Sequence, residues 1–145
     1  MISPILEPDF DRLFEIEQQA HLVPWAKGTL LNSQGERYLN LKLSVENQIV
    51  AFAICQFVLD EATLFNIAVD PAYQGKGYGK QLLQALVEQL KQKQITTLWL
   101  EVRVSNTKAL QLYSALGFNE VTIRKNYYPT QDGGREDAVV MALYL

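Results

Sequence analysis

The sequence predicts an α+β domain, a mixed and mostly antiparallel β-sheet with helices on both faces. Residues 38–69 hold three apolar runs separated by short polar turns, which is typical of an antiparallel meander. Residues 62–104 then follow a strand, helix, strand pattern, which indicates a parallel crossover. A further helix and two strands complete the chain. At 145 residues, with no linker, repeat or low-complexity tract, we expect a single domain over residues 1–145.

Residues 9–20 form the first predicted helix, because their apolar side chains recur at helical spacing and polar ones gather opposite. Glu17 departs from this pattern, since its spacing places it among the apolar residues. Either it reaches solvent at the edge of the helix, which is the commoner case, or it faces a site. We expect His21, the only histidine, to be a packed or surface residue rather than a catalytic one. A short helix is predicted through Leu30 and Leu31.

The meander begins at residues 38–45, where apolar and polar side chains alternate strictly, as in a half-buried strand. Residues 49–59 are more continuously apolar, which indicates a more buried strand, and residues 62–69 supply the third. Cys55 is the only cysteine and lies in the second strand, so we expect a buried, inert thiol and no intrachain disulfide. This cysteine usage fits a reducing, cytoplasmic location.

The crossover contains a helix at residues 79–93 and a strand at residues 96–104. Two-residue alternation divides the side chains of this strand between two faces. One face carries Leu98, Leu100 and Val102, and the other carries Trp99, Glu101 and Arg103. From this pattern alone, Glu101 is a solvated strand carboxylate.

A second helix is predicted at residues 107–116, with Asn106 as its N-cap and Gly117 as its C-cap. Residues 118–125 and 138–145 are expected to be closing strands, separated by a loop.

Composition and charge exclude several classes of function. The net charge of −3 and the isoelectric point of about 5.1 give no electrostatic reason to expect nucleic-acid binding. No apolar segment approaches the roughly 18 residues of a membrane span, and no signal peptide is expected. With one Cys and one His, a Cys/His zinc site is out of reach, and we expect no bound metal. These observations favour a cytoplasmic protein without membrane or nucleic-acid partners.

Three glycines lie between the third strand and the crossover helix, in the stretch QGKGYGK from Gln74 to Lys80. In that setting backbone N–H groups and a helix N-terminus can bind a phosphate group. The Walker A pattern requires Ser or Thr after Gly-Lys, and neither Gly-Lys pair here satisfies it. A G-x-G-x-x-G fingerprint fails as well, because Lys80 or Leu82 stands where its third glycine would be. The loop is therefore either a plain turn or a phosphate site of another kind.

The spacing Gln74-x-x-Gly77-x-Gly79, after a meander and at the start of a long helix, resembles the signature of the GNAT family of N-acetyltransferases. The resemblance covers nearly the whole chain. The stretches GERYLN, DEATLFNIAVDP, TLWLEVR, LGFNE and NYYPT resemble in particular the RimI-type subfamily, whose members acetylate the N-terminal alanine of small-subunit ribosomal protein eighteen. The resemblance implies the GNAT fold, acetyl-CoA as acetyl donor, and the N-terminal peptide of a ribosomal protein as acceptor.

The resemblance also implies a donor site. Backbone amides of Gly75 to Lys80 would hold the pyrophosphate of the coenzyme, and residues 67–69 would bond to its pantetheine arm through their main chain. Lys76 and Lys80 add positive charge, although a lysine in a surface loop is more often only solvated. Asn106 can cap its helix and also contact acetyl-CoA. The residues implied to bind acetyl-CoA are Ile67, Ala68, Val69, Gln74, Gly75, Lys76, Gly77, Tyr78, Gly79, Lys80 and Asn106.

Acetyl transfer needs a neutral amine, a polarised carbonyl and a proton for the leaving thiolate. The resemblance implies that Glu101 is the general base, acting directly or through a water; a peptide α-amine, with a pKa of about 7.7–8.0, makes that a modest task. It also implies that Tyr113, by pattern alone a core aromatic, donates the proton to the thiolate. The oxyanion would face backbone N–H groups around Ala68 and Val69. Direct attack is expected because Cys55 lies in a core strand.

The sequence indicates the residues of the acceptor site less clearly than those of the donor site. In the loop at residues 126–137, Tyr127 and Tyr128 either wall a peptide site or sit in a turn. Four acidic residues could attract a basic peptide, although solvated turn charges are commoner: Asp60, Glu61, Glu136 and Asp137. Two alternatives stay open, a GNAT enzyme that acts on lysine side chains or a small-molecule amine, and a catalytically silent acyl-CoA-binding module.

Overall fold

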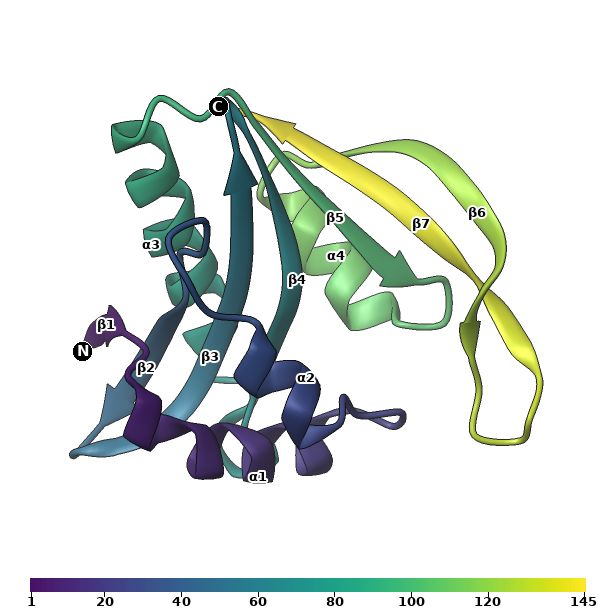
Figure 1. Cartoon of the computed structure of the whole chain (residues 1–145). Coiled ribbons are helices and arrows are strands. Elements are labelled where there is room, and N and C mark those ends of the chain that lie inside the picture. Colours follow the sequence, from purple (N-terminus) through teal and green to yellow (C-terminus); the bar gives the residue numbers. More distant parts are fainter.

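A seven-stranded β-sheet forms the centre of the computed structural model, which describes all 145 residues. The strands are β1 (Ile2–Pro4), β2 (Leu41–Val45), β3 (Gln48–Val58), β4 (Glu61–Val69), β5 (Thr97–Arg103), β6 (Asn119–Pro129) and β7 (Arg135–Tyr144). They lie in the order β1-β2-β3-β4-β5-β7-β6, and every neighbouring pair is antiparallel except β4 and β5. The predicted mixed sheet is confirmed, with its meander and its parallel crossover (Figure 1).

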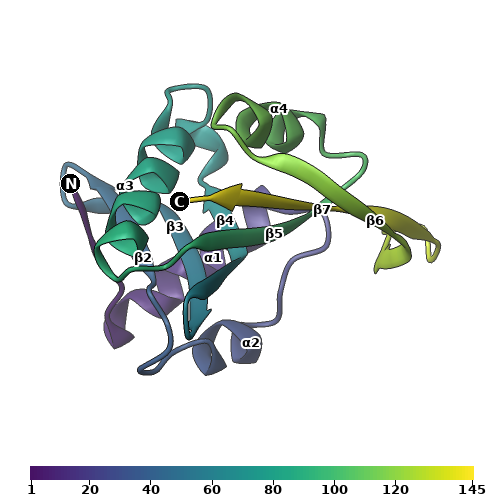
Figure 2. The same cartoon turned by 90° about the horizontal axis from the view of Figure 1, so that it is seen from above.

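Helices cover both faces of this sheet, as predicted (Figure 2). On one face lie α3 (Tyr78–Gln92) and α4 (Thr107–Ala115), and on the other lie α1 (Phe10–Ala20) and α2 (Lys27–Asn32). Two short 3-10 turns, η1 (Glu7–Asp9) and η2 (Pro71–Tyr73), complete the elements. None of these helices is long and apolar enough to cross a membrane.

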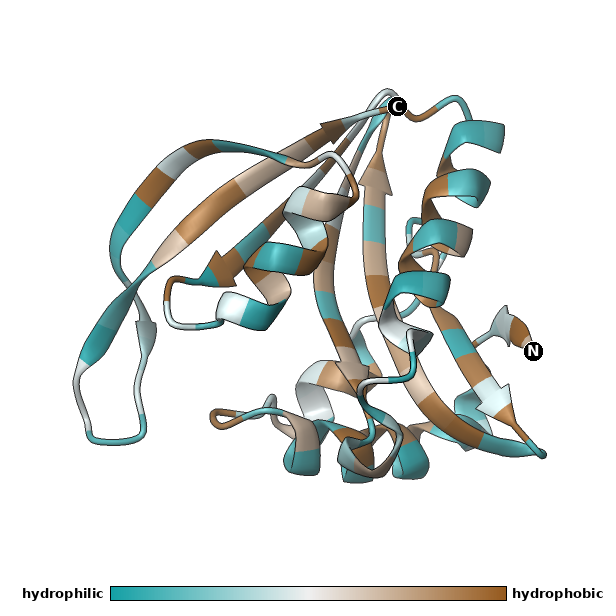
Figure 3. Cartoon of the chain, turned by 180° about the vertical axis from the view of Figure 1, so that it is seen from behind, coloured by the Kyte–Doolittle hydropathy of each residue, from teal (hydrophilic) through white to brown (hydrophobic).

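Each face of the sheet has its own core. The larger cluster joins the apolar stripe of α3, with Leu82, Leu86 and Leu90, to the sheet and to α4. The smaller cluster lies under α1, around Leu13 and Ile16. Figure 3 shows the matching pattern, with apolar and polar residues alternating along the strands and dividing α3 lengthwise. Both patterns arise because each element buries only one side.

At the start of the chain two boundaries differ from the predictions. β2 begins at Leu41 rather than at residue 38, because Tyr38 makes only an isolated bridge to Gln56. β1 was not predicted, since its three residues are too few to show a two-residue period.

The outer hairpin also differs from its prediction. The loop expected at residues 126–137 is mostly strand, because β6 runs to Pro129 and β7 begins at Arg135, which leaves a turn at 130–134. β6 is exposed along nearly its whole length, so it lacks the buried alternation that marks a strand in sequence. The two strands form a ribbon that projects beyond the rest of the sheet (Figure 1).

A β-bulge in β4 changes which side chains face which core. Ile54 pairs with Asn66 while Cys55 pairs with Leu64, so Phe65 is the extra residue. In a regular strand Leu64 and Asn66 would share a face. Instead Leu64 joins the larger core, whereas Asn66 points to the other face and bonds to α1.

β4 and β5 separate beyond this bulge. Their parallel pairing ends at Leu64 and Leu100, yet the strands continue to Val69 and Arg103. The edge of β4 that faces β5 is therefore unpaired over its last residues, and the sheet opens there.

Candidate active site

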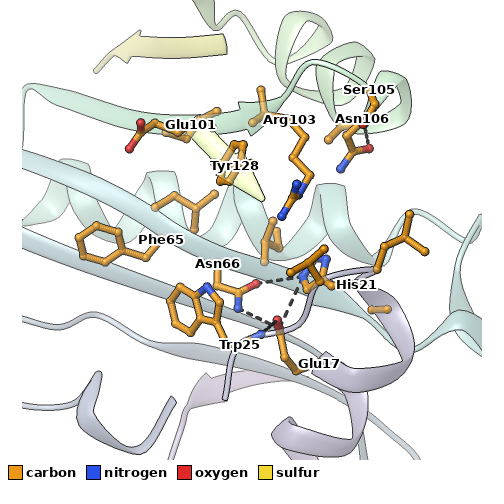
Figure 4. A pocket seen from close by; sticks show the side chains of 18 of the residues that line it. Glu17, His21, Trp25, Phe65, Asn66, Glu101, Arg103, Ser105, Asn106 and Tyr128 are labelled. Carbon is orange, nitrogen blue, oxygen red and sulfur yellow. Dashed lines mark hydrogen bonds and ion pairs between the residues drawn. The ribbon is translucent and has the colours of Figure 1, made fainter. Parts of the chain in front are cut away.

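The gap between β4 and β5 leads into a cavity of about 410 Å³ that is lined from both faces of the sheet. From one face, α4 and its N-cap contribute Tyr113 and Asn106. From the other face, α1 and its C-cap contribute Glu17 and His21. Glu101 of β5 lies on this second side as well, because its neighbours in the strand point into the larger core (Figure 4). The cavity thus connects the α3/α4 face with the α1 face.

The glycine loop lies just before α3, outside the lining of this cavity. Gly75 and Gly77 have φ angles of +78° and +82°, and a Cβ atom added at either would meet nothing within 4 Å. The first helical bond of α3 runs from Gln81 N–H to Gly77 O. The six N–H groups from Gly75 to Lys80 donate to no acceptor within the chain. Successive free N–H groups around left-handed residues, before a helix N-terminus, are suited to an anionic group.

Two side chains fasten the start of this loop. Gln74 Nε2 donates to Val69 O at 3.0 Å, which closes the end of β4. Asp70 accepts from Ala72 N at 3.0 Å and from Arg12 Nη2 of α1 at 2.7 Å. These hydrogen bonds, first from Ala72 and then from Arg12, hold the pKa of Asp70 below its usual value. The loop is therefore tied both to its own strand and to the helix on the opposite face.

The backbone of β4 decides which of its predicted donor contacts face the gap. Asp70 N–H donates to Val50 O of β3, and main-chain groups alternate in direction along a strand. Ala68 therefore bonds toward β3, whereas Ile67 and Val69 turn their main-chain groups toward β5, where β4 has no partner. Ala68 also buries its side chain in the smaller core. Of the three predicted contacts, Ile67 and Val69 are brought to the gap and Ala68 is not.

Glu101 points away from the larger core, as its alternation predicts. Its Oε2 lies 3.0 Å from Arg124 Nε in an ion pair, and its Oε1 accepts a 3.4 Å hydrogen bond from the Tyr127 hydroxyl. The buried Oε2 accepts no hydrogen bond, because no donor is aligned with it, the Arg124 Nε–H of the ion pair included. Arg103 is not a partner of Glu101, because its guanidinium pairs with Glu136 at 3.3 Å.

Tyr113 reaches the cavity from α4 and is 5% exposed. Its ring packs on Phe118 with 5.5 Å between centroids, so it serves both the core and the cavity. Burial raises the pKa of Tyr113, and the nearby Tyr128 raises it further. Burial, helped by the charge of Glu101, also raises the pKa of Tyr128 to about 12. Both phenols keep their protons at neutral pH.

Some of the remaining predicted residues line the cavity and others lie outside it. Asn106 caps α4 through a 3.2 Å bond from Ala109 N, as predicted, and also lines the cavity. Of the two tyrosines considered as a peptide wall, Tyr128 lines the cavity and Tyr127 is 40% exposed. Lys76 lies over the Tyr73 ring at 5.8 Å, beside the glycine loop.

The four acidic residues considered for peptide attraction each bond to a local group, and none lines the cavity. They are Asp60 (Thr96 hydroxyl), Glu61 (Trp99 indole), Glu136 (Ser105 amide and Arg103) and Asp137 (Asn126 amide).

Glu17 is a cavity residue for which the sequence left two alternatives open, solvent or a site, and it lines the cavity. The expectation that it reaches solvent is wrong, since it is 1% exposed. Its Oε2 accepts from Trp25 N at 2.9 Å, and its Oε1 accepts from Asn66 Nδ2 at 2.8 Å. His21 Nε2 lies 3.1 Å from Asn66 Oδ1 and 3.5 Å from Glu17 Oε1. The available signal was an acidic residue on an apolar stripe, but the side chain that meets it depends on the bulge in β4.

Comparison with known proteins gives the chain its relatives. It matches the acetyltransferase (GNAT) family model over residues 1–118. It is 68% identical over 145 residues, 100% of both chains, to the ribosomal protein bS18-alanine N-acetyltransferase of Haemophilus ducreyi. It is 56% identical over 142 residues to the protein of the same name in Escherichia coli strain K12, which covers 98% of this chain and 95% of that one.

Solved structures agree with these matches. The crystal structure of the ribosomal-protein-S18-alanine N-acetyltransferase from Escherichia coli superposes with a TM-score of 0.96 at 56% identity, covering 99% of this chain and 92% of that one. Arabidopsis thaliana NAA60 in complex with acetyl-CoA shares the fold, with a TM-score of 0.87 at 16% identity over 100% of this chain and 98% of that one. The chain therefore belongs to the GNAT family of acetyltransferases, in the RimI-type branch that its sequence resembles.

Proposed function

We propose that this protein transfers an acetyl group from acetyl-CoA to the N-terminal alanine of ribosomal protein bS18. The names of relatives that are 68% and 56% identical support this acceptor. The observation that carries the proposal is the cavity between β4 and β5, because it joins two faces of the sheet and holds a candidate acid on one and a candidate base on the other. A ribosomal-protein acceptor supports a cytoplasmic location for the reaction.

The donor would lie on the α3/α4 face, where it supplies an activated acetyl thioester. The free N–H groups of Gly75 to Lys80 would bind its pyrophosphate, since they form an anion-binding arrangement. The main-chain groups of Ile67 would bond to the pantetheine arm along the unpaired edge of β4, where the Val69 C=O already accepts from Gln74. Asn106 lines the same side of the cavity.

The acceptor amine would enter from the α1 face. Glu101 would remove its proton, directly or through a water, so that the neutral amine attacks the acetyl carbonyl. The Val69 N–H would face the oxyanion that forms. As the new C–N bond forms, the nitrogen would lose its second proton to solvent. As the C–S bond breaks, the protonated phenol of Tyr113 would supply a proton to the leaving sulfur and afterwards regain one from solvent.

Direct attack is favoured over an acetyl-cysteine intermediate. Cys55 is fully buried in β3 and does not line the cavity. Burial also raises its pKa to about 12, which removes the thiolate needed for nucleophilic attack.

Mass spectrometry of three synthetic peptides tests this function. One peptide carries an N-terminal alanine in the bS18 sequence, the second carries another N-terminal residue, and the third has a blocked N-terminus and an internal lysine. We expect acetylation of the first peptide at its α-amine. Acetylation of the third peptide in preference to the first would identify a lysine acetyltransferase. Tight acetyl-CoA binding without turnover of any peptide would identify a silent binding module.

A further inference from the structure

The cavity has a second polar centre, which the proposed acetyl transfer leaves without a role. It consists of Glu17, Asn66 and His21, on the α1 face (Figure 4). Glu17 is 1% exposed and Asn66 is 8% exposed, whereas a third of the His21 side chain is open. A carboxylate this buried destabilises a fold unless donors surround it.

Glu17 determines the hydrogen-bond roles of its neighbours. Both oxygens of Glu17 act as acceptors, because the Trp25 N–H faces Oε2 and the NH₂ group of Asn66 faces Oε1. The amide oxygen of Asn66 then faces His21, and an amide oxygen also only accepts. Nε2 of His21 must therefore carry the proton of the neutral ring.

The other ring nitrogen is left as an acceptor. With its proton on Nε2, His21 has a lone pair on Nδ1, and no group in the chain donates to it. The ring lines the cavity on the side where Glu101 lies. Under the proposed function, the substrate on that side would be a peptide N-terminus, whose amine and following amides are N–H donors.

We propose that Nδ1 of His21 accepts a hydrogen bond from an N–H group of the acceptor peptide. Glu17 and Asn66 are positioning residues, because they hold the imidazole in the required tautomer. Glu17 also ties the Trp25 amide, and with it the loop between α1 and α2 that lines the cavity. This inference rests on the proposed function, since it assigns one contact of the acceptor.

Nitrogen NMR tests the tautomer without any activity measurement. His21 is the only histidine, so the imidazole signals of ¹⁵N-labelled protein report on this ring alone. In the neutral form of the imidazole ring, we expect Nε2 to be protonated and Nδ1 to be unprotonated. Saturating alanine peptide should move the Nδ1 signal, and acetyl-CoA alone should leave it in place. A proton on Nδ1, or no response to the peptide, would overturn the proposal.

Two substitutions at His21 test the roles of its two ring nitrogens separately. In His21→Gln the side-chain amide replaces Nε2, so the contact with Asn66 persists and the Nδ1 acceptor is lost. We expect the KM for the peptide to rise about fivefold to tenfold, the size of one hydrogen bond, with kcat and the Kd for acetyl-CoA nearly unchanged. In His21→Asn an amide oxygen can replace Nδ1, so a clearly smaller rise is expected. Equal effects in both variants, or no rise in His21→Gln, would contradict the assignment.

An exchange of acid and amide tests the positioning pair. Glu17→Gln leaves an NH₂ group facing the NH₂ of Asn66, so we expect the peptide KM to rise roughly tenfold. Adding Asn66→Asp restores every bond, because Gln at position 17 then accepts from Trp25 and donates to the new carboxylate, which accepts from His21. The double variant should recover most of the wild-type KM, and failure to recover would refute the positioning role.

A matched control uses the same helix. Glu15 is on the exposed side of α1, with 61% of its side chain accessible, and Glu15→Gln should leave the peptide KM unchanged. Peptide acetylation by the wild-type protein distinguishes a failure of the proposed function from a failure of the contact at His21. If it does not acetylate the alanine peptide, the proposed function fails; if it does and His21→Gln has the wild-type KM, only the contact at His21 fails.

Discussion

Replacing Gly77 with alanine tests the donor loop directly. Gly77 has a φ angle of +82°, and an added Cβ would meet nothing within 4 Å, so the substitution introduces no clash. Its cost is backbone strain alone, about 1–2 kcal/mol for a residue with a side chain in the left-handed region.

This strain should act on donor binding. The Gly77 N–H bonds to no group in the chain, so the variant loop can relax to negative φ while the donor is absent. Binding must then restore the left-handed conformation, and the Kd for acetyl-CoA should rise about 5-fold to 30-fold. Calorimetric titration measures this change. S-acetylpantetheine lacks the pyrophosphate, so its affinity should be the same for variant and wild type.

Gly133 provides a matched control, and Gly28 provides a comparison without backbone strain. Gly133 has a φ of +86° and equally open surroundings, but it lies in the turn between β6 and β7. Gly133→Ala carries the same strain and should leave the acetyl-CoA Kd unchanged. Gly28 is helical and also unobstructed, so Gly28→Ala should raise the free energy of unfolding by about 0.4–1 kcal/mol. If Gly77→Ala binds acetyl-CoA like wild type, or loses as much affinity for S-acetylpantetheine, the loop does not hold the pyrophosphate.

Three further substitutions test the catalytic groups and the anchor of the loop. Glu101→Gln should lower turnover roughly 10²-fold to 10⁴-fold near neutral pH, and this loss should shrink above the amine pKa of about 8. An unchanged pH–rate profile would remove Glu101 from the mechanism. Tyr113→Phe should slow release of the thiol in stopped-flow assays while the unfolding midpoint changes little; a normal rate would exclude the acid role. Asp70→Asn should lower the free energy of unfolding by about 1.5–3 kcal/mol at neutral pH by weakening the Arg12 pair. The folded pKa of Asp70 is depressed, so its contribution to the free energy of unfolding is complete above its unfolded pKa of about 3.9 and is lost as pH falls through the folded pKa. Urea titrations should therefore show the stabilities of the variant and the wild type converging in acid.

Periodicity in the sequence predicts most of the elements, because each buries one side and leaves a local pattern. The alternation at residues 96–104 placed Glu101 opposite the larger core, and the structure confirms that face in β5. The same method ended β6 too early, at residue 125 rather than at Pro129, because this strand is exposed along nearly its whole length and carries little such pattern. Capping is also local, so Asn106 was identified as a helix cap from its neighbours alone.

The glycine loop and the centre at Glu17 show where that information ends. The sequence by itself determined that a loop rich in glycine precedes a long helix, because turn chemistry and helix periodicity involve neighbouring residues. Only the tertiary structure decided that Glu17 is buried and that its partner is Asn66, which lies 49 positions away. The extra residue Phe65 turns Asn66 toward α1, and the packing of α1 on the sheet brings the two side chains together. Contacts of this kind depend on how separate elements meet, and the pattern within each element does not contain them.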